Sequence, residues 1–370
     1  MFQPEDAVGS VRHRYAYLDV LRGLVIVLMA LDHVRGFIAP LGSNPTDFEQ
    51  TSELFFLVRW VTHLCAPTFV FLMGVSAFFR YTKNPEGCRR FLIQRGFWLI
   101  ALEVSWVSFS WGWDVTHTYL GVLWALGGSM ILLAALVGLP SLWVGVIGGA
   151  VIVGLEVLAI KPDPGLLQIL FQPGSMVIVG HKIGSAYPLL PWFGVAALGW
   201  GLAPWLIRAR QQVLAVTGTA AVSAFALYRG LQWTDPDPWA VQTRFGLTVA
   251  DFLNPSKYPP SLCFVLLTLG VALLILAGPA RRVGPVNRML TVFGRVPMFF
   301  YLLHLPLAHG LGNGFAWWVH GVARVPATEP VSIATILVSW AVVLGLLWPI
   351  CVRWDRLKRR RQDVWWLRYL

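Results

Sequence analysis

Long apolar stretches separated by shorter polar segments recur along the whole chain. A membrane-spanning helix needs about 20 mostly apolar residues, and about ten stretches approach or exceed that length. They are 18–40, 54–80, 90–110, 118–137, 140–160, 187–207, 211–229, 261–279, 290–311 and 331–351. The pattern predicts an all-α, polytopic membrane protein with about ten transmembrane helices.

The composition supports this class. Of the 370 residues 56% are hydrophobic and only 13% are charged, whereas about 25% is usual in soluble proteins. The first apolar run is too long for the core of a signal peptide and no small-residue cleavage site follows it, so we expect a retained first span. The 4 cysteines are scattered, which predicts neither a disulfide framework nor a metal site.

Basic residues indicate the orientation. With the N-terminus in the cytoplasm, most of the 29 lysines and arginines fall in cytoplasmic segments, as the positive-inside rule requires. Among them are Arg12, Arg14, Arg281 and Arg282. We therefore expect both termini in the cytoplasm, with a lead at 1–17 and a basic tail at 352–370. Positive-inside sorting explains the net charge of +11, and no nucleic acid partner is expected.

Ionisable side chains interrupt the apolar runs at a similar depth. His33, Glu103 and His304 each lie about seven residues inside the outer end of a predicted span, which is roughly 10 Å deep, and His63 lies slightly deeper. Such residues are costly in a membrane and mark functional sites by default. We predict His33, His63 and Glu103 as catalytic groups that share one layer. The alternative for each histidine is a hydrogen bond between helices.

The first predicted span restricts what can orient His33. Asp32 is adjacent to His33, so the two side chains point about 100° apart on a helix and cannot form a pair. A carboxylate that orients His33 must come from another helix, and Glu103 is a candidate. Asp32 and Arg35 are three residues apart and can form a packing pair or the outer rim of a site.

Three predicted outer segments are long, at about 41–53, 161–186 and 230–260, and long loops often line sites. We predict that residues in or beside them bind an acceptor substrate. The alternative is that they maintain loop structure or belong to the aromatic belt of the membrane interface. The candidates are Glu53, Tyr187, Asn254, Lys257 and Tyr258.

Five stretches together resemble one protein family. They are "YLDVLRGLVIVLMALDHVRGF" (17–37), "APTFVFLMGVSAFF" (66–79), "YPLLPWFGVAALGWGLAP" (187–204), "NPSKYPPSLCFVLLTLG" (254–270) and "FGRVPMFFYLLHLPLAH" (293–309). The set is similar to the bacterial branch of the transmembrane acyltransferase family named for heparan-α-glucosaminide N-acetyltransferase. On this resemblance, residues 1–370 form a single transmembrane acyltransferase domain.

The resemblance implies an enzyme of the bacterial cytoplasmic (inner) membrane. It would move an acetyl group from cytosolic acetyl-CoA to an amino or hydroxyl group of a glycan on the extracytoplasmic side. Acetyl-CoA, the sugar acceptor and the lipid bilayer are then its partners, and no metal is implied. The CoA-binding set comprises Arg295 as the first candidate for the phosphates, Arg22 as the second, and His304. Arg22 can instead form a structural ion pair with Asp19, three residues before it.

The essential histidine of the eukaryotic relative lies in a loop that corresponds to 38–53, and this loop contains no histidine here. His33 or His63 would then have taken over its role. We hypothesise that His33 is the base that deprotonates the acceptor, with His63 or Glu103 orienting it. Direct transfer in a ternary complex and a covalent acyl-histidine intermediate both stay open.

Two other functional classes are weighed against the enzyme. A proton-coupled secondary transporter could use the His/Glu layer as a relay, but transporters usually contain repeated halves, which this sequence does not show. A non-catalytic membrane scaffold leaves the polar layer unexplained. The acceptor, the acyl chain length and the oligomeric state stay open, with a homodimer as one option.

Overall fold

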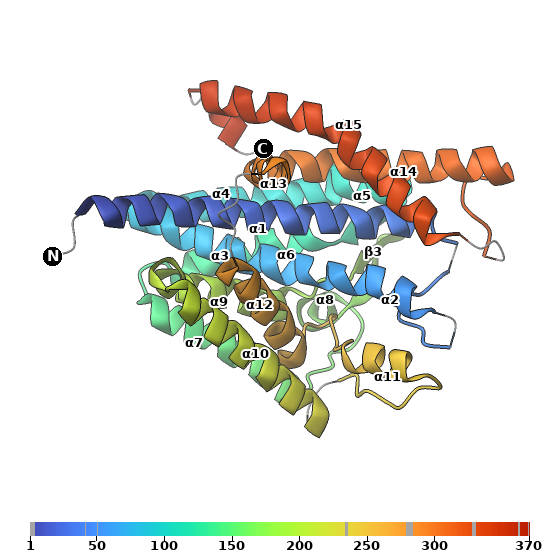
Figure 1. The fold of residues 1–370 in the computed structure, drawn as a ribbon, viewed down its shortest axis with the longest axis horizontal. Helices are drawn as coiled ribbons and strands as arrows, with labels where there is room; N and C mark the ends of the chain where they lie inside the picture. The colour runs from blue at the N-terminus through green and yellow to red at the C-terminus, as the bar shows by residue number, and fades with distance from the viewer. Residues whose placement is uncertain are drawn as a thin grey trace. The chain divides into compact units, whose positions relative to one another are not determined.

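The computed structural model shows a predominantly helical chain (Figure 1). It describes residues 4–40, 42–49, 51–233, 236–278, 284–327, 331–361, 363–368 and 370. Arg281 and Arg282, and the side chains of Arg12 and Arg14, lie outside the described part. The chain forms two compact units. The first comprises Met1–Cys65, Gln242–Asp251 and Pro279–Leu370, and the second comprises Ala66–Val241 and Phe252–Gly278.

The first unit is built around α1, which packs against α13, α14 and α15 and against the short turn η1. Figure 1 shows α1 and α14 lying side by side. The elements of this unit are α1 (Pro4–Ile38), α2 (Glu53–Trp60), η1 (Val61–Leu64), α11 (Phe245–Phe252), α13 (Pro285–Arg295), α14 (Pro297–His320), α15 (Ile333–Arg360) and η3 (Trp365–Arg368).

The second unit consists of packed helix pairs, α4 with α6, α7 with α9 and α10 with α12. Its helices are α3 (Cys65–Lys83), α4 (Pro85–Leu102), the π turn η2 (Glu103–Val107), α5 (Ser108–Gly112), α6 (Val122–Leu136), α7 (Ser141–Leu158), α8 (Leu166–Phe171), α9 (Leu189–Arg208), α10 (Gln211–Leu231) and α12 (Leu262–Ala277). Its strands are β1 (His117–Leu120), β2 (Gly174–Ile178) and β3 (His181–Ser185).

The three strands form a small sheet in the order β1-β3-β2, with β3 parallel to β1 and antiparallel to β2. A two-residue turn joins β2 to β3, and both Val179 and Gly180 have positive φ, as this tight hairpin turn requires. The predicted helix 118–137 is therefore wrong at its start, because residues 118–120 belong to β1. Local periodicity missed β1 because its partner β3 lies far along the chain.

Side-chain caps define where several helices begin. Ser52, Asn84, Ser261 and Ser332 each precede a helix and accept a hydrogen bond from a backbone N–H in its first turn. These caps satisfy donors that have no partner inside the helix. The helices also extend past two predicted limits, because α1 begins within the expected lead and α15 runs into the expected tail.

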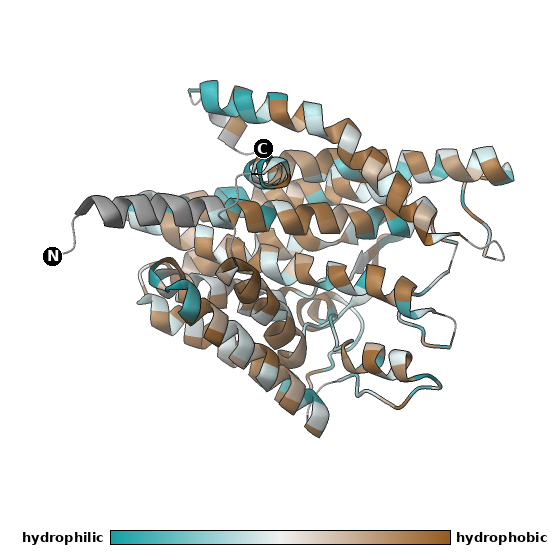
Figure 2. Cartoon of the chain, in the orientation of Figure 1, coloured by the Kyte–Doolittle hydropathy of each residue, from teal (hydrophilic) through white to brown (hydrophobic). Residues whose placement is uncertain are grey.

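The all-α membrane class is confirmed, since the structure contains long apolar helices. Within the described residues, 5 helices are long and apolar enough to cross a membrane, or 6 if the bent pair α13–α14 is one span. Helices α6 and α12 have only 15 and 16 residues. Figure 2 shows α12 as hydrophobic along its length and hydrophilic residues gathered at the C-terminal end of α15.

Three predicted spans are not regular helices. The second is interrupted by the 3₁₀ turn η1 and the third by the π turn η2. The predicted ninth span, 290–311, is wrong as a single helix, because α13 and α14 meet at 95°. Pro297 lies at this bend, where its ring and missing N–H prevent α13 from continuing in a straight line.

Glycines allow α1 and α13 to approach closely. A Cβ added to Gly23 would overlap the carbonyl oxygen of Leu290, and a Cβ added to Gly294 would overlap the carbonyl oxygen of Asp19. The two backbones are therefore in direct contact, and only glycine fits at these two positions.

We expect Gly23→Ala to destabilise the protein, because a methyl group against a backbone carbonyl forces the helices apart at about 1–3 kcal/mol. The matched control is Gly36→Ala in the same helix, where a Cβ meets nothing within 4 Å. Apparent Tm values of the purified variants in detergent check this. Equal Tm values for the two variants would contradict the close contact.

Candidate functional site

Two histidines of the first unit are joined by a hydrogen bond. His33 Nδ1 on α1 lies 2.7 Å from His304 Nε2 on α14, although the residues are 271 positions apart. The ring centroids are 4.9 Å apart and the planes differ by 16°. A short N···N distance with this wider centroid separation means that the rings lie edge to edge in nearly one plane. This is the geometry of a well-directed N–H···N bond.

The two rings differ in their access to the surface. His304 is fully buried, with 0% relative exposure, whereas His33 is half-buried. The rings of Phe300 and Tyr301 lie near His304, at centroid distances of 5.3 and 5.4 Å. The structure therefore brings together His33 and His304 of the predicted layer, with His33 as the more accessible member.

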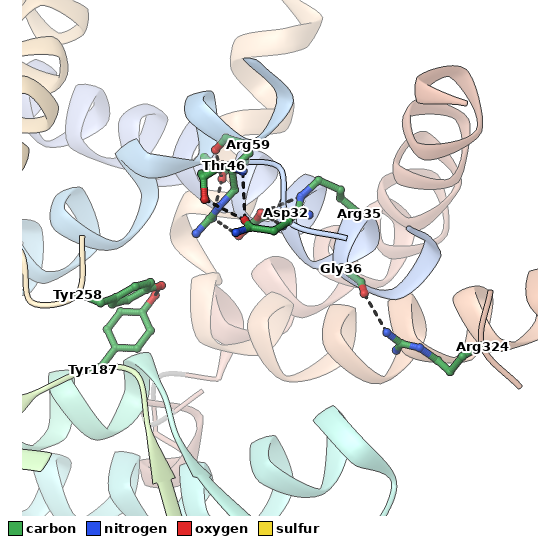
Figure 3. Close-up of polar contacts among 10 residues, drawn as sticks. Asp32, Arg35, Gly36, Thr46, Arg59, Tyr187, Tyr258 and Arg324 are labelled. Atoms are coloured by element: carbon green, nitrogen blue, oxygen red, sulfur yellow. Dashed lines mark hydrogen bonds and ion pairs between the residues drawn. The ribbon is translucent and has the colours of Figure 1, made fainter. Parts of the chain in front are cut away.

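Asp32 joins two arginines beside this pair. Its carboxylate lies 3.0 Å from Arg35 Nη2 and 2.6 Å from Arg59 Nη1. Figure 3 shows both arginines directed toward Asp32. Arg59 also donates to the hydroxyl of Thr62, at 3.2 Å. The pair expected within α1 is thus part of a larger network that ties α1 to α2. The sequence contained the signal for it, namely an arginine inside the second predicted span.

At the other end of the apolar part of α1, Asp19 lies between two arginines. Arg22 Nη1 lies 3.0 Å and Arg295 Nε lies 3.8 Å from the Asp19 carboxylate. Arg22 thus forms the ion pair with Asp19 that the sequence offered as the alternative to binding a CoA phosphate. Asp355 also acts electrostatically on Asp19 and forms an ion pair of 2.6 Å with Arg359. Three arginines and two carboxylates therefore leave a local excess of one positive charge. The Arg295 side chain is 39% exposed and that of Arg22 is 23% exposed, so Arg295 is the more accessible.

Glu103 of the second unit is buried and caps a helix. Its Oε2 accepts hydrogen bonds from the backbone N–H groups of Leu123 and Trp124, at 2.6 and 3.1 Å. These donors belong to the first turn of α6, which lacks a side-chain cap of its own. His33 belongs to the other unit, so its orientation by Glu103 stays a prediction.

His63 is also buried, within the 3₁₀ turn η1 that packs against α1. Short 3₁₀ segments inside a longer helical stretch often mark hinges or functional sites. A catalytic role for His63 stays a prediction.

Three of the predicted acceptor residues lie together in the second unit. The hydroxyls of Tyr187 and Tyr258 are 3.3 Å apart (Figure 3), and Lys257 Nζ lies 4.9 Å from the centroid of the Tyr258 ring. Asn254 is on the same loop, and its carbonyl accepts a hydrogen bond of 3.2 Å from Arg229 NH2. Arg229 is buried and also donates to the carbonyls of Asp237 and Phe252, so it holds this loop against α10.

The remaining predicted acceptor residue, Glu53, belongs to the first unit. Its carboxylate lies 3.3 Å from Arg244 NH1 in an exposed ion pair. Exposed pairs contribute little stability, so this contact leaves Glu53 available for another partner. Among the described residues, no group of three or more His, Cys, Asp or Glu side chains is placed to hold a metal ion.

The sequence profile of one family, described as heparan-alpha-glucosaminide N-acetyltransferase, catalytic, matches residues 14–231. The match covers more than half of the 370 residues. The chain belongs to this family. No curated protein matches it. Membership in the heparan-alpha-glucosaminide N-acetyltransferase family supports a membrane acyltransferase and does not favour a transporter.

The heparan-alpha-glucosaminide N-acetyltransferase match includes some predicted site residues and ends before others. Those inside it are Arg22, His33, Glu53, His63, Glu103 and Tyr187, and those beyond it are Asn254, Lys257, Tyr258, Arg295 and His304. The hydrogen bond between His33 and His304 therefore joins the matched region to the part of the chain that follows it.

We expect Glu103→Leu to lower the apparent Tm, because it removes the acceptor of two buried N–H groups at a cost of about 1–3 kcal/mol. Glu103→Gln keeps an acceptor oxygen and should retain stability, but it should lower acyl transfer, because a neutral amide orients the base less strongly than a carboxylate. Glu156→Gln is the matched control, since Glu156 accepts a hydrogen bond of 2.6 Å from Leu262 N in the first turn of α12. A stable Glu103→Gln protein with full activity would exclude Glu103 from the catalytic set and leave it only the capping role.

Proposed function

We propose that this protein transfers an acetyl group from cytosolic acetyl-CoA to an amino or hydroxyl group of a glycan on the extracytoplasmic side of a bacterial inner membrane. Family membership supports the acyl transfer. In this proposal residues 1–370 act as one acyltransferase domain. The donor, the acceptor and the sidedness are inferences from the family and from the charge distribution.

The proposed topology has about ten spans and cytoplasmic termini. Each predicted apolar stretch overlaps one or more helices. In this topology α6 and α12 would cross at about 23 Å in a locally thinned bilayer or as parts of the packed core. The basic segments at the end of α15 and around α13 support a cytoplasmic placement of both.

The main support for the proposed mechanism is the hydrogen bond between His33 and His304, which holds the proposed base in place. Transfer from a thioester requires a base for the acceptor proton and donors for the oxyanion. His33 is half-buried and held by a neighbour, as a base must be to meet a substrate in a defined direction. His63 and Glu103 complete the proposed catalytic set.

The arginines around Asp19 form the proposed binding site for the CoA phosphates. Guanidinium groups bind phosphate oxygens with paired hydrogen bonds, and the local excess of positive charge favours an anion. Arg295 is the first candidate because it is the more exposed of the two arginines. Arg22 would contribute by sharing Asp19.

The acceptor would be bound by Tyr187, Tyr258, Lys257, Asn254 and Glu53. A sugar presents apolar C–H faces to aromatic rings and hydroxyls to polar groups, and the paired tyrosines offer both kinds of contact. The buried Arg229 would hold the loop in place during binding.

We expect His33→Gln to abolish acetyl transfer from radiolabelled acetyl-CoA to membrane glycan, because the amide cannot accept the acceptor proton at neutral pH. The decrease should be about 10²-fold or more. His117→Gln is the control, since this exposed histidine lies on β1 outside the proposed site. Full activity of a folded His33→Gln variant would exclude His33 as the base.

We expect CoA to raise the apparent Tm saturably, because a ligand that binds only the folded state stabilises it. Arg295→Gln should shift the saturation to higher CoA concentrations, whereas Arg288→Gln, exposed on the same helix, should shift it little. No response to CoA, together with proton-dependent uptake of a solute, would favour the transporter.

A further inference from the structure

The hydrogen bonds of His304 determine where its proton lies. Its Nδ1 is 3.2 Å from the backbone carbonyl oxygen of Phe300. A carbonyl oxygen only accepts, so His304 Nδ1 must carry the hydrogen. A neutral imidazole has one N–H, and therefore His304 Nε2 is left with a lone pair.

The tautomer of His304 determines that of His33. His33 Nδ1 lies 2.7 Å from His304 Nε2, which carries no hydrogen. His33 Nδ1 must therefore carry the hydrogen and donate it in the hydrogen bond between the two rings. The lone pair of neutral His33 then lies on the other ring nitrogen, Nε2. The two facing nitrogens cannot both carry hydrogens, so one N–H···N bond fixes both tautomers.

We propose that His304 is the positioning residue of His33: it holds His33 in the Nδ1–H tautomer and fixes its ring plane, so that Nε2 acts as the base. This inference rests on the proposed acetyl transfer. With this role His304 would no longer belong to the CoA-binding set, because it would act by positioning His33 and would not contact CoA.

His33 Nε2 takes the proton from the attacking amine or hydroxyl of the acceptor. The new bond to the acetyl carbon forms as the C–S bond of acetyl-CoA breaks. The CoA thiolate leaves with the bonding electrons and takes the proton from His33, which restores the neutral Nδ1–H tautomer.

The complete burial of His304 favours a positioning role over direct contact with CoA. His304 has 0% exposure, and its neighbours are the aromatic residues Phe300 and Tyr301 on its own helix. A buried ring of this kind affects a bound molecule through its more accessible, half-buried partner, which is His33. Histidines that bind metals or act as bases are commonly oriented in this way by a group on the second ring nitrogen.

Nitrogen-15 labelling of histidine reads the tautomer directly and does not depend on activity. Solid-state NMR of the full protein in lipid bilayers should show His33 as the Nδ1–H tautomer, with its signals assigned by their loss in His33→Gln. His304→Leu should convert His33 to the Nε2–H form that predominates for an imidazole in water. His304→Gln keeps an acceptor oxygen near the place of Nε2 and should preserve Nδ1–H.

His309→Leu is the matched control. His309 is a second buried histidine of α14 that faces α1, where its ring stacks on Phe37 with centroids 4.5 Å apart. Replacing it removes a buried imidazole from the same helix pair and should leave the His33 tautomer unchanged. This comparison separates a specific hydrogen bond from a general loss of packing.

The kinetic prediction is a decrease in kcat with an unchanged KM for acetyl-CoA. His304→Leu should lower kcat about 10-fold or more, and His304→Gln should restore a substantial part. A raised KM with unchanged kcat would overturn the positioning role and return His304 to the CoA-binding set.

The tautomer of the unmodified protein decides the proposal even if His304→Leu does not fold. An Nε2–H signal for His33 there, or an Nδ1–H signal that survives in a folded His304→Leu variant, would overturn it. Nδ1–H at His33 in a protein that transfers no acetyl group would support the hydrogen-bonded chain and overturn only the proposed function.

Discussion

A polar group inside a lipid bilayer has no water to bond, so it must find its partners within the protein. This constraint organises the ionisable residues of the chain. Asp32 is held between Arg35 and Arg59, and Asp19 lies between Arg22 and Arg295. Each carboxylate also ties α1 to another helix, so neutralising a charge and positioning a helix are the same interaction.

Departures from regular helix occur at or next to three of the predicted site residues. His63 lies in a 3₁₀ turn, Glu103 begins a π turn, and Arg295 precedes the bend between α13 and α14. A change in helical pitch rotates the following side chains and alters which backbone groups are bonded. The chain thereby presents polar groups in directions that a straight apolar helix would not provide, and acyltransfer chemistry requires such groups.

The heparan-alpha-glucosaminide N-acetyltransferase match and the histidine pair complement one another. The match ends at residue 231, whereas His304 lies well beyond it. The pair therefore connects the region that identifies the family to the C-terminal helices. Glu103, by contrast, has a sufficient structural reason for its burial, because the first turn of α6 needs an acceptor.

The sequence by itself determined the membrane class and the family resemblance, located most of the helical segments, and offered the ion pairs of Asp19 with Arg22 and of Asp32 with Arg35 as alternatives that the structure contains. All of these depend on composition or on neighbours within one helical turn. Only the tertiary structure decided the bend before α14, the pairing of β1 with β3, and the contacts of Asp32 with Arg59 and of His33 with His304. Periodicity gives the depth of a residue along one helix. Which face meets which neighbour depends on packing between segments that are distant in sequence, and a hydrogen bond across 271 residues leaves no local pattern.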